Sequence, residues 1–143
     1  MRYRVGWPFP GRVLALIHFS SDVTAEDYAG IMAAAGAELA QADQPFHLLI
    51  DNSRLADETI AGLDDMLAAA PALRHEHLRW IVVVLPDSIK RRAPRMAVQR
   101  NGGIQLKYVD SVYYAIRFLL TIDESMREAK SAIAFWQPPA PPA

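Results

Sequence analysis

The sequence contains no cysteine, and this absence excludes disulfide bonds, thiolate zinc sites and thiol nucleophiles. It fits a reducing compartment, so we expect a cytoplasmic protein. Long apolar runs are also missing, because the most hydrophobic stretch, residues 80–85, ends at Pro86, whereas a membrane span needs roughly 18 apolar residues. The first ten residues hold two arginines and two prolines instead of the apolar core of a signal peptide. The sequence therefore predicts a soluble protein without a transmembrane segment.

Neither sign of charge is in large excess, since 15 lysines and arginines face 16 aspartates and glutamates, for a net charge of −1. This balance argues against nucleic acid as a partner. The charges are unevenly placed, because residues 74–107 hold eight basic and two acidic side chains, whereas residues 1–73 hold four and ten. Four of the basic residues stand close together, namely Lys90, Arg91, Arg92 and Arg95. They predict a solvated face that complements the acidic half within the chain or across a homodimer, or a contact with an acidic partner or an anionic surface.

Hydrophobic residues make up 52% of the 143 positions, which is enough for the core of one domain. Four of the ten prolines fall within the last six residues. Proline lacks a backbone donor and resists both helix and strand, so residues 137–143 are expected to form a flexible tail. Residues 1–136 are expected to form a single domain.

Hydrophobic patterning predicts an opening hairpin followed by strands that alternate with helices. Expected strands cover residues 3–5, 13–19, 46–50, 78–85 and 113–122. The last of these also fits a helix, but its β-branched and aromatic content favours a strand. Helices are expected over residues 25–39, about 59–70 and 123–136, with Thr24 and Asp123 as N-caps. Between Pro86 and Ile104, Pro94 and the following Asn-Gly-Gly leave one interrupted helix or two short ones.

The predicted fold class is α/β, with a single-layer mixed, mostly parallel sheet of about five strands flanked by helices. The order of elements resembles the STAS-like superfamily, in its SpoIIAA-like branch. The resemblance rests on residues 13–19 followed by Asp22-Val23-Thr24-Ala25-Glu26-Asp27, on residues 46–51, and on residues 121–129 through Trp136. It covers the chain from about Tyr3 to Trp136 and implies the same sheet with helices.

The resemblance also implies a functional motif, which this sequence changes. Anti-sigma-factor antagonists of that superfamily carry Asp-Ser-Ser-Gly-Leu, in which the second serine is phosphorylated at a helix start. The motif falls on Thr59-Ile60-Ala61-Gly62-Leu63, so alanine replaces the acceptor serine. Thr59 is the nearest hydroxyl, although an N-cap role also explains it. The phosphoswitch is therefore not expected, and what remains is a scaffold whose loops receive a protein partner or a small apolar ligand.

The histidines and serines allow a second hypothesis. A small hydrolase or transferase would use Ser20 or Ser53 with His18 or His47 at one end of the sheet. No Gly-x-Ser-x-Gly motif accompanies either serine, so we assign no catalytic residue. His75-Glu76-His77 lacks the further ligands of a zinc shell and predicts a solvated loop, and we expect no metal or cofactor.

The leading hypothesis is therefore a non-enzymatic STAS-like binding module. The loops after the second and third strands should open at the carboxyl ends of a parallel sheet, where ligands bind in α/β folds. The candidate ligand- or partner-binding residues are Ser20, Asp51, Ser53, Arg54, Thr59, Lys90, Arg91, Arg92 and Arg95.

Overall fold

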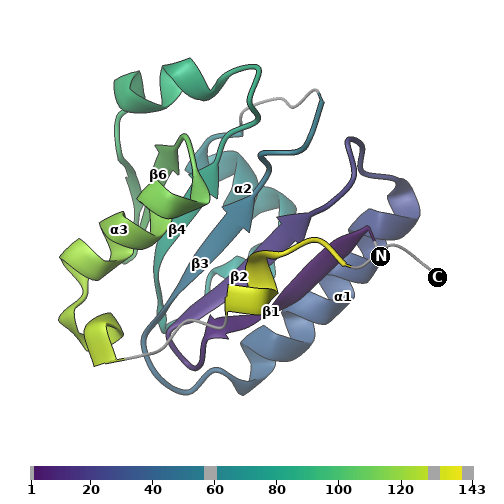
Figure 1. Cartoon of the computed structure of the whole chain (residues 1–143). Helices are drawn as coiled ribbons and strands as arrows, with labels where there is room; N and C mark the ends of the chain where they lie inside the picture. The colour runs from purple at the N-terminus through teal and green to yellow at the C-terminus, as the bar shows by residue number, and fades with distance from the viewer. Residues whose placement is uncertain (1, 57–60, 129–132, 140–143) are drawn as a thin grey trace.

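The computed structural model describes residues 2–56, 61–128 and 133–139 and contains one sheet with helices on both faces (Figure 1). Its strands are β1 (Tyr3–Phe9), β2 (Val13–His18), β3 (Phe46–Asp51), β4 (Leu78–Val84), β5 (Gln99–Asn101) and β6 (Ile104–Val109). The α-helices are α1 (Ala25–Gln41), α2 (Leu63–Ala69) and α3 (Val112–Ile122). Short 3-10 helices are η1 (Pro71–Leu73), η2 (Lys90–Arg95), η3 (Glu124–Glu128) and η4 (Ile133–Trp136).

The sheet has six strands in the order β1-β2-β3-β4-β6-β5. The four central strands are parallel, and the two edge strands, β1 and β5, pair antiparallel to their neighbours. The mixed, mostly parallel α/β sheet expected from the sequence is confirmed, with six strands instead of about five. The opening hairpin and the strands β3 and β4 lie where the sequence places them.

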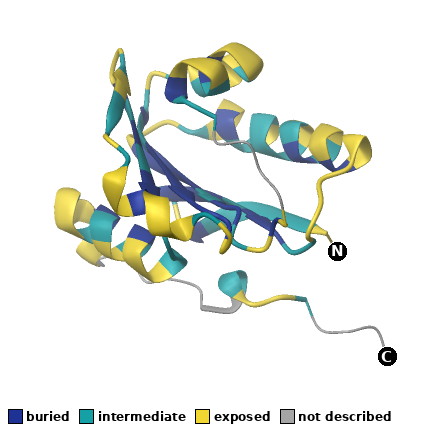
Figure 2. Cartoon of the chain, turned by 90° about the horizontal axis from the view of Figure 1, so that it is seen from above, coloured by how far each residue is buried: buried dark blue, intermediate teal, exposed yellow. Residues whose placement is uncertain are grey.

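Side chains that alternate along each strand form two cores, one on each face of the sheet. Figure 2 shows the buried strands with helices on either side of them. On β2, Leu14 points toward the face that α1 and α2 cover, whereas Val13 and Ala15 point toward α3. Leu48 on β3 shares the first face, and Leu49 shares the second. Each parallel strand is therefore buried on both sides, which explains its continuous apolar sequence.

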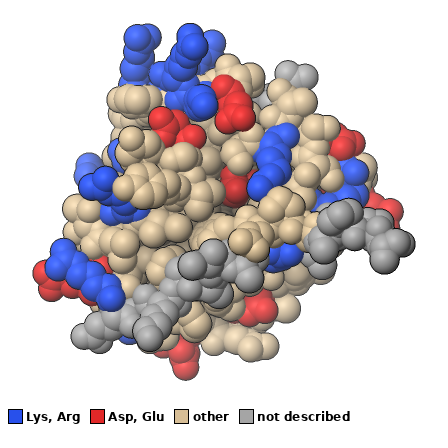
Figure 3. Space-filling model, viewed as in Figure 1, with Lys and Arg blue, Asp and Glu red and all other residues tan. Residues whose placement is uncertain are grey.

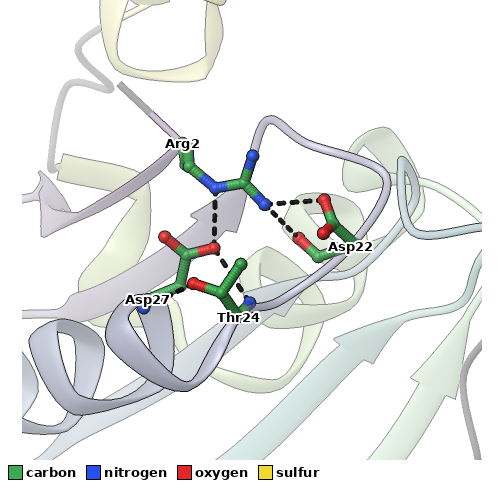
Figure 4. A network of polar contacts seen from close by, with 4 residues as sticks. All are labelled: Arg2, Asp22, Thr24 and Asp27. Carbon is green, nitrogen blue, oxygen red and sulfur yellow. Dashed lines mark hydrogen bonds and ion pairs between the residues drawn. The ribbon is translucent and has the colours of Figure 1, made fainter.

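Helix α1 has Thr24 as its N-cap, as the sequence predicts, and the structure shows that this cap is a capping box. The Thr24 hydroxyl accepts a hydrogen bond from the backbone nitrogen of Asp27 (3.0 Å), and the Asp27 carboxylate accepts one from the Thr24 nitrogen (3.1 Å). Arg2 donates to Asp27 at 2.7 Å and to Asp22 at 2.6 Å (Figure 4). The hydrogen bond from Arg2 is the main reason that the pKa of Asp27 is lowered. This network fixes the start of α1 to the start of β1.

Residues 88–109 differ from the expectation of an interrupted helix. Only the 3-10 helix η2 forms, because Pro94 lacks the backbone donor that a longer α-helix needs. The chain then makes the β5–β6 hairpin, whose turn includes Gly102 at a φ of 60°. That left-handed conformation suits glycine, so the Asn-Gly-Gly sequence marks a hairpin and not a break between helices.

The strand expected over residues 113–122 was wrong, because Val112–Ile122 forms α3. The Ser111 hydroxyl caps this helix by accepting a hydrogen bond from the backbone nitrogen of Tyr114 (3.1 Å). Ala115 and Leu119, four residues apart, are buried against the sheet. The segment therefore follows helical spacing, although its composition favours a strand.

Two further helices differ from their expected bounds. Helix α2 begins at Leu63 instead of near Thr59, and Thr59 lies outside the described residues. The expected helix over residues 123–136 was wrong, because two short 3-10 helices, η3 and η4, are separated by residues that are not described. Asp123 accepts hydrogen bonds from the nitrogen (3.0 Å) and the hydroxyl (2.6 Å) of Ser125, which form a tight turn at that point.

Candidate functional site: an apolar cavity between two helices and the sheet

A cavity of about 530 Å³ lies between α1, α2 and the first face of the sheet. The strands contribute inward-facing apolar side chains, namely Val5, Leu14, Leu16, Leu48, Ile50 and Val83. These residues occupy alternate positions, so they all project to the same face. The volume is within the range of known small-molecule sites, roughly 300–1,000 Å³.

Small side chains on the helices leave this space unfilled. Ala35 and Gly36 line the cavity from α1, and Ala69 and Ala70 line it from the end of α2. Larger side chains at these four positions would fill the space between the helices and the sheet, as in an ordinary close-packed core. The cavity therefore follows from the residue sizes on two helices, a feature that hydrophobic periodicity alone does not reveal.

The lining contains four polar side chains, from His18, Tyr28, Asn52 and Asp65, of which Tyr28 is exposed. His18 ends β2 and is 9% exposed, and Asn52 follows β3 and is 6% exposed. Burial lowers the pKa of His18, although the charges of Asp51 and Asp27 partly oppose this effect. The imidazole is therefore neutral at pH 7, and it places a donor and an acceptor in an otherwise apolar wall.

Helix α2, which forms one wall, is held at its start by the β5–β6 hairpin. Its N-cap residue, Gly62, has no side chain to cap the helix. Gln99 supplies the missing acceptor, because its side-chain oxygen accepts a hydrogen bond from the backbone nitrogen of Leu63 (2.8 Å). Asn101 donates to Asp64 at 2.8 Å, and the Tyr108 hydroxyl donates to the carbonyl of Ala61. In the sequence, the one signal of this arrangement is Gly62 before the acidic first turn of α2, because glycine has no side chain and another residue must cap the helix.

Three of the sequence-predicted site residues come together beside this cavity, at the end of β3. The Asp51 carboxylate is buried and accepts a hydrogen bond from the Ser53 nitrogen (3.0 Å), while Arg54 lies 3.6 Å from its other oxygen. Ser53 and Arg54 also line an open depression of about 620 Å³ with Asp87 and Ser88. Asp51 thus stabilises the turn that follows β3, as an aspartate does in an Asx turn. Ser20 is half-buried in the bend after β2.

The predicted basic residues form a separate group on η2. Lys90, Arg91, Arg92 and Arg95 are all exposed, and Figure 3 shows Lys and Arg side chains gathered over this helix. The buried side chain of Ala93 packs η2 against the core. Lys90 lies 3.9 Å from Asp87. None of the four residues lines the apolar cavity.

The other histidines have structural partners. His47 Nε2 lies 2.7 Å from an oxygen of Asp123, and burial lowers the pKa of His47 despite this contact. His75 Nε2 lies 2.9 Å from the carbonyl of Leu39, and its Nδ1 accepts a hydrogen bond from the His77 nitrogen. In the described ranges 2–56, 61–128 and 133–139, no hydrogen bond joins Ser20 or Ser53 to a histidine, and no group of three or more metal-ligating side chains occurs.

Comparison with protein-family models, with curated proteins and with solved structures found no match. Within the described part of the chain, the helices are all too short or too polar to cross a membrane.

Proposed function

We propose that this protein binds a small apolar ligand and is not an enzyme. The observation that carries the proposal is the cavity of about 530 Å³, whose walls are almost wholly apolar. An apolar molecule that leaves water for such a site gains roughly 25 cal/mol per Å² of buried apolar surface. Of the two occupants that the sequence allows, a protein or a small ligand, the volume of the cavity favours the small ligand.

The position of Ala61 supports the same proposal. In the resemblance to anti-sigma-factor antagonists, Ala61 takes the place of the phosphorylated serine, and its side chain lines the cavity. An apolar side chain at this position suits an apolar ligand, whereas a phosphoserine would bring charge into the cavity. We also propose that the domain is a divergent STAS-like domain of the cytoplasm, with the hairpin, the Thr24-capped helix and the following strand as support.

Binding of N-phenyl-1-naphthylamine, an uncharged dye that fluoresces in apolar surroundings, tests the proposal. We expect the wild-type protein to bind the dye, and the cavity-filling variant Ala35→Phe to lose this binding. Ala37→Phe is the matched control, because Ala37 lies on the exposed side of the same helix.

Circular dichroism and urea unfolding of both variants establish that they remain folded. Equal dye binding by the wild-type protein and folded Ala35→Phe would place the dye elsewhere and overturn the proposal. Absence of dye binding to the wild-type protein would also overturn the proposal.

A further inference from the structure

The apolar cavity has one polar end. His18 and Asn52 lie at the carboxyl ends of the adjacent parallel strands β2 and β3. Ile17 of β2 pairs with Asp51 of β3. His18 and Asn52 are the residues that directly follow this pair along the chain. Both line the cavity, and both are more than nine-tenths buried. Two polar side chains are thus neighbours at one end of the space.

The His18 ring has hydrogen-bonding capacity that the protein does not use. Within residues 2–56, 61–128 and 133–139, no hydrogen bond joins this ring to another group. His47 and His75, the comparable histidines of the fold, both contact an oxygen. A ligand group that bonds to His18 would use this capacity.

We propose that this polar end binds an uncharged hydroxyl group, so that the ligand is an apolar chain that ends in an alcohol. The inference rests on the proposed function, because it concerns the same cavity. A hydroxyl both donates and accepts, which matches the one donor and one acceptor of a neutral imidazole.

The surrounding charges argue against an acidic ligand. Asp51 and Asp27 lie close enough to act on the titration of His18, and Asp65 is part of the cavity lining. Burial lowers the pKa of His18, so at neutral pH the ring offers no positive charge to a carboxylate. An anionic head group would lose its water of solvation, and the described cavity lining contains no lysine or arginine to replace it.

Displacement of N-phenyl-1-naphthylamine by three ligands of similar length tests the inference. The ligands are 1-decanol, its isomer 1-methoxynonane, which lacks the hydroxyl donor, and decanoate. Water solvates the alcohol better than the ether, so a wholly apolar cavity would favour the ether. We expect decanol to bind about fivefold more tightly than the ether, as one net hydrogen bond provides, and decanoate to bind least.

The variant His18→Phe should lose the preference for decanol over the ether. His77→Phe is the matched control, since His77 lies outside the cavity lining, and it should keep the preference. The nitrogen-15 resonances of the His18 ring should shift on addition of decanol and not of the ether.

The two proposals fail in different ways. If the dye does not bind, the proposed function fails. If the dye binds and decanol shows no advantage over the ether, or decanoate binds best, only the hydroxyl inference fails. A preference for decanol that persists in folded His18→Phe would also overturn it.

Discussion

The contact between His47 and Asp123 shows how one buried residue joins distant parts of the chain. His47 lies at the start of β3, and Asp123 directly follows α3. Burial opposes ionisation of Asp123, but hydrogen bonds from Ser125 and His47 outweigh it and lower the pKa of Asp123. A neutral His47 that donates from Nε2 leaves Nδ1 as a buried acceptor without a hydrogen bond among the described residues.

The two buried histidines predict a pH dependence of stability. Burial lowers the pKa of both His18 and His47 in the folded state, so below about pH 6.5 the unfolded chain binds protons that the folded chain does not. The unfolding free energy should therefore be constant just above pH 6.5 and fall as the pH is lowered from there. The slope should approach about 1.4 kcal/mol per pH unit for each histidine.

Urea unfolding between about pH 5 and 8 measures this dependence. His18→Phe and His47→Gln should each remove part of the slope, and the double variant should remove most of it. A double variant as sensitive to pH as the wild-type protein would contradict the assignment to these two rings.

The sequence places both histidines in strands, and the structure agrees. Their different surroundings could not be predicted, because each depends on a contact across the fold. Asp123 is 76 residues from His47. The empty space beside His18 depends on small residues of α1 and α2, such as Ala35 and Ala69.

At the scale of elements, the β5–β6 hairpin supports the cavity wall. Its turn requires Gly102 at a φ of 60°, and it carries Gln99 and Asn101, two of the residues whose side chains hold α2. The hairpin therefore positions the start of α2, although the two are distant in the sequence. A change in the hairpin turn should affect α2 for this reason.

Gly102→Ala should lower the unfolding free energy by about 1–2 kcal/mol, because alanine is strained in the left-handed conformation. A Cβ at Gly102 would have open space around it, so the effect is one of backbone conformation alone. Gly103→Ala is the matched control, since it also has open space and its φ is not in that region. Equal stability of the two variants in urea unfolding would contradict the role of the turn.

The elements that the sequence predicts well have local signals. Helix α1 has its capping box, and β4 has a continuous β-branched run. The errors lie where local composition and tertiary packing disagree. Residues 112–122 are rich in strand-forming side chains, yet Ser111 starts a helix whose buried face covers the sheet.

At the scale of the whole molecule, the two ends of the chain lie together. Arg4 on β1 donates to the carbonyl oxygens of Phe135 (2.6 Å) and Gln137 (2.9 Å). The Phe135 ring packs so closely on β1 that a Cβ at Gly6 would lie 2.8 Å from it. The flexible tail expected over residues 137–143 stays a prediction, since residues 140–143 lie outside the described part.

Loss of the Arg4 side chain should loosen this end of the chain. In Arg4→Leu, chymotrypsin should cleave after Phe135 or Trp136 several-fold faster than in the wild-type protein, because local opening exposes the backbone. Arg12→Leu is the matched control, as the Arg12 side chain bonds only to an exposed Gln44 side chain in the hydrogen bonds described. Mass spectrometry of the fragments identifies the cleavage sites. Identical cleavage rates for the two variants would show that Arg4 does not hold the segment.

The hydrogen bonds that hold α2 come from residues later in the chain, and this order affects folding during synthesis. Gln99 follows Leu63 by 36 residues, and Tyr108 follows Ala61 by 47. A ribosome releases the chain from its N-terminus, so the β1–β2 hairpin, α1 and β3 emerge well before the residues that hold α2 in place. The cavity therefore acquires its last wall late in synthesis. Ligand binding that needs this wall therefore has to wait until the residues of the β5–β6 hairpin have been made.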